Sequence, residues 1–407
     1  MRNVAFSQLY PITRLFCLLL LAAYLMLVSS NPAQAQSYNV LYSFTGPTTD
    51  ASWPMVLLQA PDGTLYGGSC YGGRSFGGAA FALLPNGKET ILYNFLAGYG
   101  SCPDSFLSWN GELYGATGAG GFYGGGAIFK LNKNGDEVVL HSFPRGVGPQ
   151  LYFSDGKGNF YGSGGGGSLG YGTVFKVASS GKVTILHNFG LDSPEGYSPE
   201  SLVADNNGNI YGATFEGGDP NCKCGTLFKL DPAGDLTILH VFTGGSDGTQ
   251  PIGLVRDDAG NLYGATISGG VTNVVCPNGC GVIYELTASG AYKILYGFAG
   301  TPDGISPFTI VRDQAGTLYG LTDEGGDTNC YHGWNGGIGC GVVFKLDATG
   351  KETILHSFAG VSDGSYPQSL ILGSAGQLYG ATESGGDAAC TMWGSYIGCG
   401  TIFELTP

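Results

Sequence analysis

Short apolar runs and turn-forming residues alternate along the chain after about residue 36. The runs are rich in β-branched and aromatic side chains, as in 262–266 (Leu-Tyr-Gly-Ala-Thr) and 172–177 (Gly-Thr-Val-Phe-Lys-Val). Gly, Asn, Asp and Pro separate them, and this combination predicts short β-strands joined by turns. No stretch of this region has the period of an amphipathic helix. The pattern therefore predicts an all-β protein.

One apolar–aromatic segment recurs seven times. Its copies are Leu41–Phe44, Leu92–Phe95, Leu140–Phe143, Leu186–Phe189, Leu239–Phe242, Leu295–Phe298 and Leu355–Phe358. Each copy is followed by a segment that begins at a proline, a Leu-Tyr-Gly segment and a segment similar to Gly-Thr-Val-Phe-Lys. Four strands in a repeat of roughly fifty residues are typical of one blade of a β-propeller.

The two ends of the repeat region are out of phase. After residue 36 the chain begins with the fourth strand of a repeat (Val40–Phe44) and ends with the third (Thr401–Leu405). All blades are complete only if both ends share one blade, an arrangement that also removes an exposed sheet edge. The sequence thus predicts a seven-bladed β-propeller with four antiparallel strands per blade, closed by the N-terminal strand completing the last blade.

The repeat resembles the GloVer tandem-repeat family of bacterial exported proteins. The resemblance is carried by 262–266, 225–230 (Gly-Thr-Leu-Phe-Lys-Leu), 355–358 (Leu-His-Ser-Phe) and 363–367 (Asp-Gly-Ser-Tyr-Pro), and it spans the mature chain. It implies an exported repeat protein and assigns no catalytic residue. Family members often end in a surface anchor. Because this chain ends on a blade strand, free secretion is expected.

The first 35 residues have the pattern of a secretion signal. Arg2 and Arg14 precede or border the apolar run Leu15–Val28, and Ala33-Gln34-Ala35 supplies a small-x-small cleavage site. We therefore predict a signal peptide at 1–35 and a single propeller domain at 36–407. The expected location is extracellular, with the periplasm as the alternative.

The net charge of the chain indicates which classes of binding partner are favoured. The chain has a net charge of −14, and removal of Arg2 and Arg14 with the signal makes it −16. Such an acidic surface disfavours nucleic acids and anionic membranes and favours cations or basic partners. No membrane span is expected in the mature chain, and a monomer is expected.

The predicted blade geometry separates two faces. Loops between strands two and three share one face with the connections between blades, whereas the turns on the other face are short, as in 257–261 and 347–351. The loops on the first face are longer in the later repeats and contain cysteines, which form disulfides in an exported protein. The suggested pairs are Cys222–Cys224, Cys276–Cys280, Cys330–Cys340, Cys390–Cys399 and, between the first two blades, Cys70–Cys102.

Aromatic residues in two of these loops form a candidate binding patch. Tyr331, His332 and Trp334 lie in the longest cysteine-flanked loop, and Trp393 and Tyr396 lie in the matching loop of the last repeat. Exposed aromatic rings bind sugar rings or partner proteins, or they pack against one another. The first alternative predicts a ligand site for an extracellular glycan or protein.

A series of acids precedes the proline of strand one in five repeats: Asp50, Glu195, Asp247, Asp303 and Asp363. These side chains would surround the mouth of the central channel and hold a divalent cation such as calcium. Alternatively, each carboxylate accepts hydrogen bonds from the backbone of its own turn. The second alternative needs no metal, and no other cofactor is expected.

Another set of acids follows strand two: Glu216, Asp323, Glu324 and Glu383. Paired carboxylates at a suitable separation hydrolyse glycosidic bonds, whereas isolated loop acids are solvated. In contrast, His141, His187, His240 and His356 occupy a strand-four position that is Tyr in the other repeats, which indicates a packing role.

Three functions are compatible with these features. The first is a secreted, non-catalytic binding propeller that recognises an extracellular glycan or protein through its disulfide-containing face. The second is a polysaccharide hydrolase or lyase that uses the loop carboxylates. The third is a structural component of an extracellular matrix. The sequence contains no nucleophile elbow or phosphate-binding loop, which favours binding over catalysis.

Overall fold

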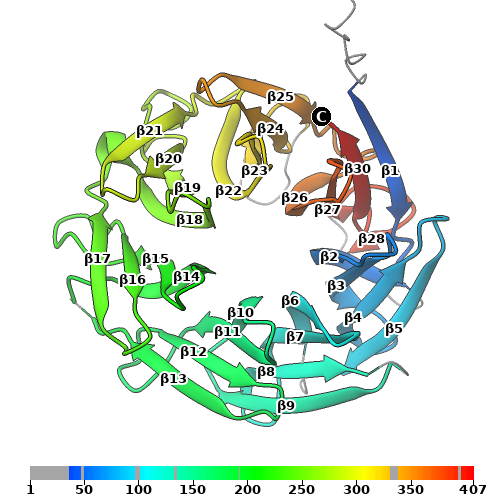
Figure 1. The fold of residues 1–407 in the computed structure, drawn as a ribbon. Helices are drawn as coiled ribbons and strands as arrows, with labels where there is room; N and C mark the ends of the chain where they lie inside the picture. Colours follow the sequence, from blue (N-terminus) through cyan, green and yellow to red (C-terminus); the bar gives the residue numbers. More distant parts are fainter. Residues whose placement is uncertain are drawn as a thin grey trace, which may run out of the picture.

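The protein is a ring of seven four-stranded antiparallel sheets, as Figure 1 shows for the computed structural model. The structure describes residues 36–46, 50–96, 101–132, 135–191, 193–330, 338–392 and 396–407, with the backbone alone for 391–392 and 396–397. The prediction of a seven-bladed β-propeller is confirmed. The predicted signal peptide lies outside the described residues, so it stays a prediction. Among the described residues, no helix is long and apolar enough to cross a membrane.

Each blade is given from its innermost to its outermost strand. Blade 1 is β2 (Ala51–Gln59), β3 (Leu65–Gly72), β4 (Phe76–Leu83) and β5 (Glu89–Leu96). Blade 2 is β6 (Ser101–Trp109), β7 (Glu112–Ala119), β8 (Gly124–Leu131) and β9 (Glu137–Pro144). Blade 3 is β10 (Gln150–Ser154), β11 (Asn159–Gly164), β12 (Thr173–Ala178) and β13 (Val183–Asn188). Blade 4 is β14 (Tyr197–Ala204), β15 (Ile210–Glu216), β16 (Thr226–Leu230) and β17 (Leu236–Val241).

The later blades follow the same order. Blade 5 is β18 (Thr249–Arg256), β19 (Leu262–Ser268), β20 (Val282–Leu286) and β21 (Tyr292–Gly297). Blade 6 is β22 (Gly304–Arg312), β23 (Leu318–Gly325), β24 (Val342–Leu346) and β25 (Glu352–Ser357). Blade 7 is β26 (Ser365–Leu372), β27 (Leu378–Ser384), β30 (Thr401–Thr406) and β1 (Ser37–Ser43). A 3₁₀ turn (Gly245–Asp247) precedes β18, and a small hairpin of β28 (Thr391–Met392) and β29 (Tyr396–Ile397) projects from blade 7.

The N-terminal strand closes the ring. β1 pairs antiparallel with β30, from Ser37 opposite Thr406 to Ser43 opposite Thr401, and β30 also pairs with β27. Figure 1 shows the two ends of the described chain side by side in this blade. The predicted closure is therefore confirmed.

Aromatic rings from strand three fill each blade. The glycine of the Leu-Tyr-Gly segment lies beneath the ring, so that a methyl group on Gly380 would lie 2.1 Å from Phe403 Cζ and one on Gly67 would lie 2.1 Å from Phe81 Cζ. Any side chain at these positions would displace the ring. The recurrence of this glycine follows from the close approach.

Neighbouring blades meet through a glycine and a proline. The glycine before strand three has a positive φ angle and packs against the proline of strand one in the next blade. A methyl group on Gly281 would lie 2.5 Å from Pro307 Cδ, and one on Gly400 would lie 2.5 Å from Pro54 Cδ. The residue before the proline is itself left-handed, as in Ser306, whose N–H donates to Cys280 O at 2.9 Å. A register shift after the proline then bends the inner strand.

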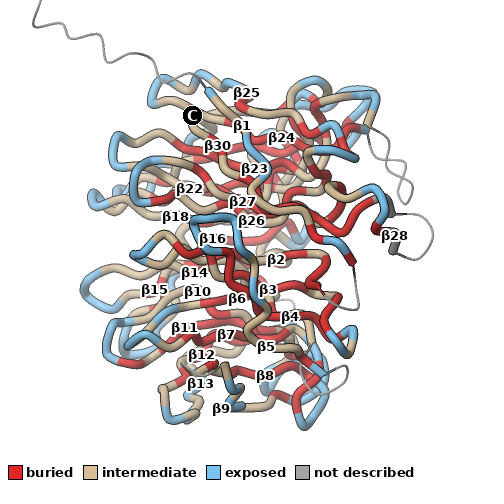
Figure 2. Tube along the Cα trace, turned by 90° about the vertical axis from the view of Figure 1, so that its right-hand side faces the viewer, coloured by how far each residue is buried: buried red, intermediate tan, exposed pale blue. Residues whose placement is uncertain are grey.

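The blades place the long loops and the short turns on opposite faces of the disc. Figure 2, an edge-on view, shows buried strand segments inside the disc and exposed segments at its two faces. The turns of one face are closed by their own aspartates: Asp257 Oδ1, for example, accepts the N–H of Asn261 at 2.8 Å. We call the opposite face, with the strand two–three loops and the connections between blades, the loop face.

We predict that Gly281→Ala destabilises the fold far more than Gly290→Ala. Both glycines have φ near +90°, but a methyl group on Gly281 would lie 2.3 Å from Thr266 O, whereas one on Gly290 would have no atom within 4 Å. The backbone cost alone is about 1 kcal/mol, and the added clash should raise the loss to about 3 kcal/mol or more. Urea unfolding of both variants measures the difference. Equal losses would show that the glycine–proline contact adds nothing to stability.

Candidate functional site

Five disulfides lie on the loop face. They join Cys222–Cys224, Cys276–Cys280, Cys330–Cys340, Cys390–Cys399 and Cys70–Cys102. These are the pairs that the sequence suggested. The first four lie across the strand two–three loops of blades 4 to 7, which we call the stapled loops (222–224, 276–280, 330–340 and 390–399). The fifth joins β3 to β6 and therefore links blades 1 and 2.

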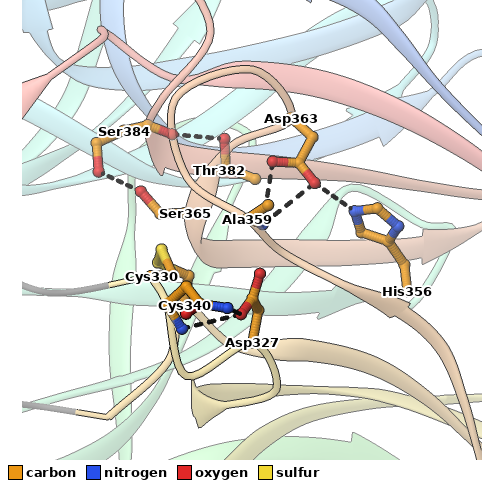
Figure 3. Close-up of a disulfide and its surroundings, with 10 residues drawn as sticks. Asp327, Cys330, Cys340, His356, Ala359, Asp363, Ser365, Thr382 and Ser384 are labelled. Atoms are coloured by element: carbon orange, nitrogen blue, oxygen red, sulfur yellow. Dashed lines mark hydrogen bonds and ion pairs between the residues drawn. A yellow bond between two sulfur atoms is a disulfide. The ribbon is translucent and has the colours of Figure 1, made fainter.

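Each stapled loop rests on the connection to the next blade. A methyl group on Gly360 would lie 3.0 Å from Cys330 Sγ, and one on Gly244 would lie 3.2 Å from Cys224 Sγ. Gly300 and Gly46 have the same relation to Cys280 Sγ and Cys390 Sγ, each at 3.7 Å. A sulfur atom of each disulfide thus packs on the connection to the next blade; Figure 3 shows the disulfide of blade 6 and the connection with Ala359 and Asp363.

The acidic series lies within these connections and faces the outermost strands. Asp363 Oδ2 accepts from the ring of His356 at 2.9 Å and from the N–H of Ala359 at 3.2 Å (Figure 3). Asp50 accepts in the same way from the hydroxyl of Tyr42 at 3.0 Å and the N–H of Thr45 at 2.9 Å. The other members have matching ring partners: His187 for Glu195, His240 for Asp247 and Tyr296 for Asp303.

These contacts correct the placement of the series at the channel mouth. The carboxylates bind the strand-four residue and the turn backbone, in agreement with the second expectation from the sequence. The described part of the chain contains no group of three or more His, Cys, Asp or Glu that could hold a metal ion. Three of the strand-four histidines, His187, His240 and His356, are partners of these acids, whereas the ring of His141 packs against Phe143.

The predicted aromatic patch falls largely outside the described residues. Tyr331, His332, Trp334 and Trp393 all lie outside them, and Tyr396 is described by its backbone in β29 alone. Their role as ligand-binding residues stays a prediction. What the structure does place is the base of both loops, at Cys330–Cys340 and Cys390–Cys399.

A depression of about 660 Å³, lined by both polar and apolar groups, lies between the stapled loops of blades 4 and 5. Both disulfide loops border it, through Lys223 on one side and Asn278 on the other. Glu216 and Gln250 also line it, together with hydroxyl groups of Thr and Ser. The lining therefore offers a carboxylate, an ammonium group and two amides on a framework held by disulfides.

The four acids predicted for catalysis do not form one group. Glu216 lines the depression at blade 4, whereas Asp323, Glu324 and Glu383 come from β23 and β27 of the adjacent blades 6 and 7. Burial and the charge of Glu324 raise the pKa of Asp323 to about 6. Burial and the charge of Asp323 raise the pKa of Glu383 to about 8, and Gln368 Nε2 donates to Glu383 Oε2 at 3.0 Å. Asp323 and Glu383 thus form an electrostatically coupled pair.

Sequence analysis missed a second group of acids on the inner strands. Asp104 and Glu200 each follow the proline of strand one, in blades 2 and 4. Burial raises the pKa of Glu200 to about 7, and burial with the nearby charge of Glu200 raises that of Asp104. Between them, the hydroxyl of Tyr152 lies 2.8 Å from Gln150 Oε1 and 3.3 Å from Glu200 Oε2.

A simple signal would have found this group. The residue after the strand-one proline is Met55, Ile252 or Phe308 in three repeats and polar in the other four. Comparison of the repeats at this position separates the polar side chains of the inner strand from the apolar ones.

A family model described as the Gloeobacter/Verrucomicrobia repeat matches residues 27–222, 108–334 and 270–407. No curated protein matches the chain in sequence. Among solved structures, the extracellular domain named for the hybrid two component system BT3049 of B. thetaiotaomicron has a TM-score of 0.57 and 14% identity, over 91% of this chain and 41% of that one. The extracellular domain of BT4673 from the same organism has a TM-score of 0.56 and 12% identity, over 89% and 40% of the two chains.

These structural similarities concern the fold of one part of each neighbour. The chain spans about two fifths of the length of both neighbours. At 12% and 14% identity the likeness shows the propeller fold alone.

We predict that Glu383→Gln stabilises the protein at pH 9 and leaves its stability nearly unchanged at pH 4. The unfolded chain releases this proton near pH 4.5, whereas the folded protein keeps it to about pH 8. Folding stability therefore falls as the pH rises through this window, and the amide removes that fall. The difference between pKa 4.5 and about 8 sets an upper limit of about 5 kcal/mol on the gain at pH 9.

Urea unfolding at both pH values measures this effect. Glu216→Gln is the control, because it removes one negative charge from strand two of another blade. Parallel pH dependence in Glu383→Gln and the unmodified protein would contradict the raised pKa of Glu383 in the folded protein.

Proposed function

The chain belongs to the Gloeobacter/Verrucomicrobia repeat family, and on this premise we propose that it is a secreted propeller that binds an extracellular glycan or protein through its loop face without transforming it. The observation that carries this proposal is the concentration of the disulfides on one face, where a depression lies between two of the loops that they close. The other face has short turns of nearly uniform construction. Disulfides of this number also fit an oxidising compartment outside the cytoplasm.

The stapled loops favour binding because the disulfide at the base of each loop is held in place. A ligand that had to immobilise flexible loops would lose affinity to their conformational entropy. Here the disulfide of each loop packs on a glycine of the adjacent connection, so the base of the loop has little freedom. The side chains at the bases of these loops are therefore held in fixed positions from which they can contact a ligand.

The depression between blades 4 and 5 suits a polar ligand. Its volume is within the usual range of small-molecule sites, and its lining combines apolar groups with charged, amide and hydroxyl groups. Such a lining can exchange hydrogen bonds with several hydroxyl groups of a sugar or with a peptide backbone. The loop aromatics of blades 6 and 7 would add a surface for stacking on the same face.

One observation supports the catalytic alternative. With pKa values of about 6 and 8, Asp323 would be ionised and Glu383 protonated at neutral pH. A pair of carboxylates in opposite protonation states is the arrangement used in glycoside hydrolysis or elimination. A polysaccharide hydrolase or lyase is therefore the second candidate, and a structural matrix component is the third.

We predict that the mature protein retains a glycan in an array or polysaccharide pull-down screen, and that Trp334→Ala and Trp393→Ala each weaken retention by about tenfold or more. Both variants remove a stacking surface from a loop and leave the blades intact. Val361→Ala is the control, because it removes an exposed apolar side chain from the same face. The screen is run with calcium and with a chelator, and thermal unfolding checks the fold.

Retention that is unchanged in both Trp variants would contradict the loop patch. Product release in the bound fractions, lost in Asp323→Asn and Glu383→Gln, would replace binding by catalysis. Loss of retention with the chelator would show a metal requirement. If no glycan is retained, a protein partner or the matrix role takes its place.

A further inference from the structure

The strand two–three loops of blades 1 to 3 contain no cysteine after the glycine pair and share a different construction. In each, the N–H after a Gly-Gly pair donates to a side-chain oxygen of strand four. Arg74 N–H donates to Asn94 Oδ1 at 2.8 Å, Phe122 N–H to Ser142 Oγ at 3.1 Å and Ser168 N–H to Asn188 Oδ1 at 3.0 Å. These loops are therefore short, anchored turns.

Large apolar side chains are exposed to solvent at the tips of these turns. Phe122 is 83% exposed, Tyr123 61%, Leu169 57% and Phe76 55%. The rings of Phe122 and Tyr123 contact each other at right angles, with centroids 4.9 Å apart. Their outer surfaces face solvent, and soluble proteins seldom leave such residues together in the open without a partner.

Two exposed arginines accompany the apolar tips. Arg74 belongs to the loop of blade 1, and Arg145 lies against the loop of blade 2, where a methyl group on Gly124 would be 3.1 Å from its Nε. Neither forms an ion pair in the part of the chain that the structure describes. The three loops (72–78, 120–126 and 166–172) contain no acidic residue, although the chain has a net charge of −14.

We propose that these tips form a second binding surface, for an acidic polysaccharide. We call it the tip arc: Arg74, Phe76, Phe122, Tyr123, Arg145 and Leu169. Sugar rings would stack on Phe122 and Tyr123, and carboxylate or sulfate groups would pair with Arg74 and Arg145. The anchored loops of three successive blades give an extended chain several points of contact.

Charge argues for this ligand over other anionic or apolar partners. A planar anionic membrane on the loop face would also meet Asp219, Asp327 and Asp387 of the stapled blades, which would repel it. A second copy of the chain would bring another net charge of −14. A linear polysaccharide can follow the tip arc and avoid those acids.

The tip arc lies on blades 1 to 3, and the stapled loops lie on blades 4 to 7. Both regions lie on the loop face, so the inference rests on the proposed function and deepens it: it names a second region of that face and the class of ligand that would bind there. Variants of one region leave the other unchanged, so the two proposals fail separately.

The test measures binding of the mature protein to polygalacturonate, with neutral dextran of matched length as the comparison, at low and high salt. We expect binding to polygalacturonate alone, weakening as salt rises. The double variant Phe122→Ala/Tyr123→Ala should lose about tenfold or more in affinity. Arg74→Gln/Arg145→Gln should bind more weakly and with less salt dependence.

Two controls define the result. Lys157→Gln removes an exposed positive charge from the face opposite the loop face, and Trp334→Ala changes the stapled loop of blade 6. Both variants should bind polygalacturonate as the unmodified protein does. Unchanged affinity in the tip-arc variants would overturn the proposal, as would absence of binding. Binding to phosphatidylglycerol vesicles without polygalacturonate binding would assign the surface to a membrane. A dimer that Phe122→Ala abolishes would assign it to a second copy.

Discussion

The structure depends on one aromatic contact that is repeated at every junction between blades. The phenylalanine of strand four in each blade packs on the strand-three ring of the next, with centroids between 5.0 Å for Phe95–Phe129 and 5.5 Å for Phe358–Phe403. The last junction uses Phe44, which directly follows the N-terminal strand, against Phe81 of blade 1 at 5.1 Å. Closure by β1 therefore supplies both the outer strand of blade 7 and the ring that joins blade 7 to blade 1.

The packing within and between blades explains which positions of the repeat can change. Strand glycines lie beneath rings and junction glycines lie against prolines, so neither position accepts a side chain. The loops beyond them have no such constraint, but their changes are linked. In the four blades with a stapled loop, the second residue after the strand-four phenylalanine is glycine, as in Gly46, Gly244, Gly300 and Gly360; in the other three blades it is Ala97, Arg145 and Leu191. Because the sulfur atoms pack on this glycine, the staple and the connection vary together.

The same repetition decides how much the sequence could predict. Seven copies of the strand pattern and the phase of its ends were enough for the fold, because each copy encodes the same packing. Repetition misled the prediction of the site, however. The recurring acids Asp50, Asp303 and Asp363 looked like a designed ring, and the structure shows them holding the connection between blades. Acids such as Asp104 and Glu200 do not recur at the same position of the other repeats, so a comparison based on recurring acids did not identify them. Loop aromatics depend on local conformation, which the repeat does not encode.

In a repeat protein, the residues at one position of different repeats can be compared to show whether the fold needs a particular side chain there. The position after the strand-one proline is Met55, Ile252 or Phe308 in three blades, which shows that the fold does not need an acid there. Glu200 at the same position has a pKa of about 7, so its ionised form destabilises the folded state above neutral pH. That carboxylate accepts a hydrogen bond from the hydroxyl of Tyr152 at 3.3 Å, whereas Asp363 at a recurring position binds two partners. Residues that recur therefore maintain the ring. Those that depart from the repeat at a cost in stability, such as Glu200 and Glu383, are the ones for which a role beyond folding must be sought.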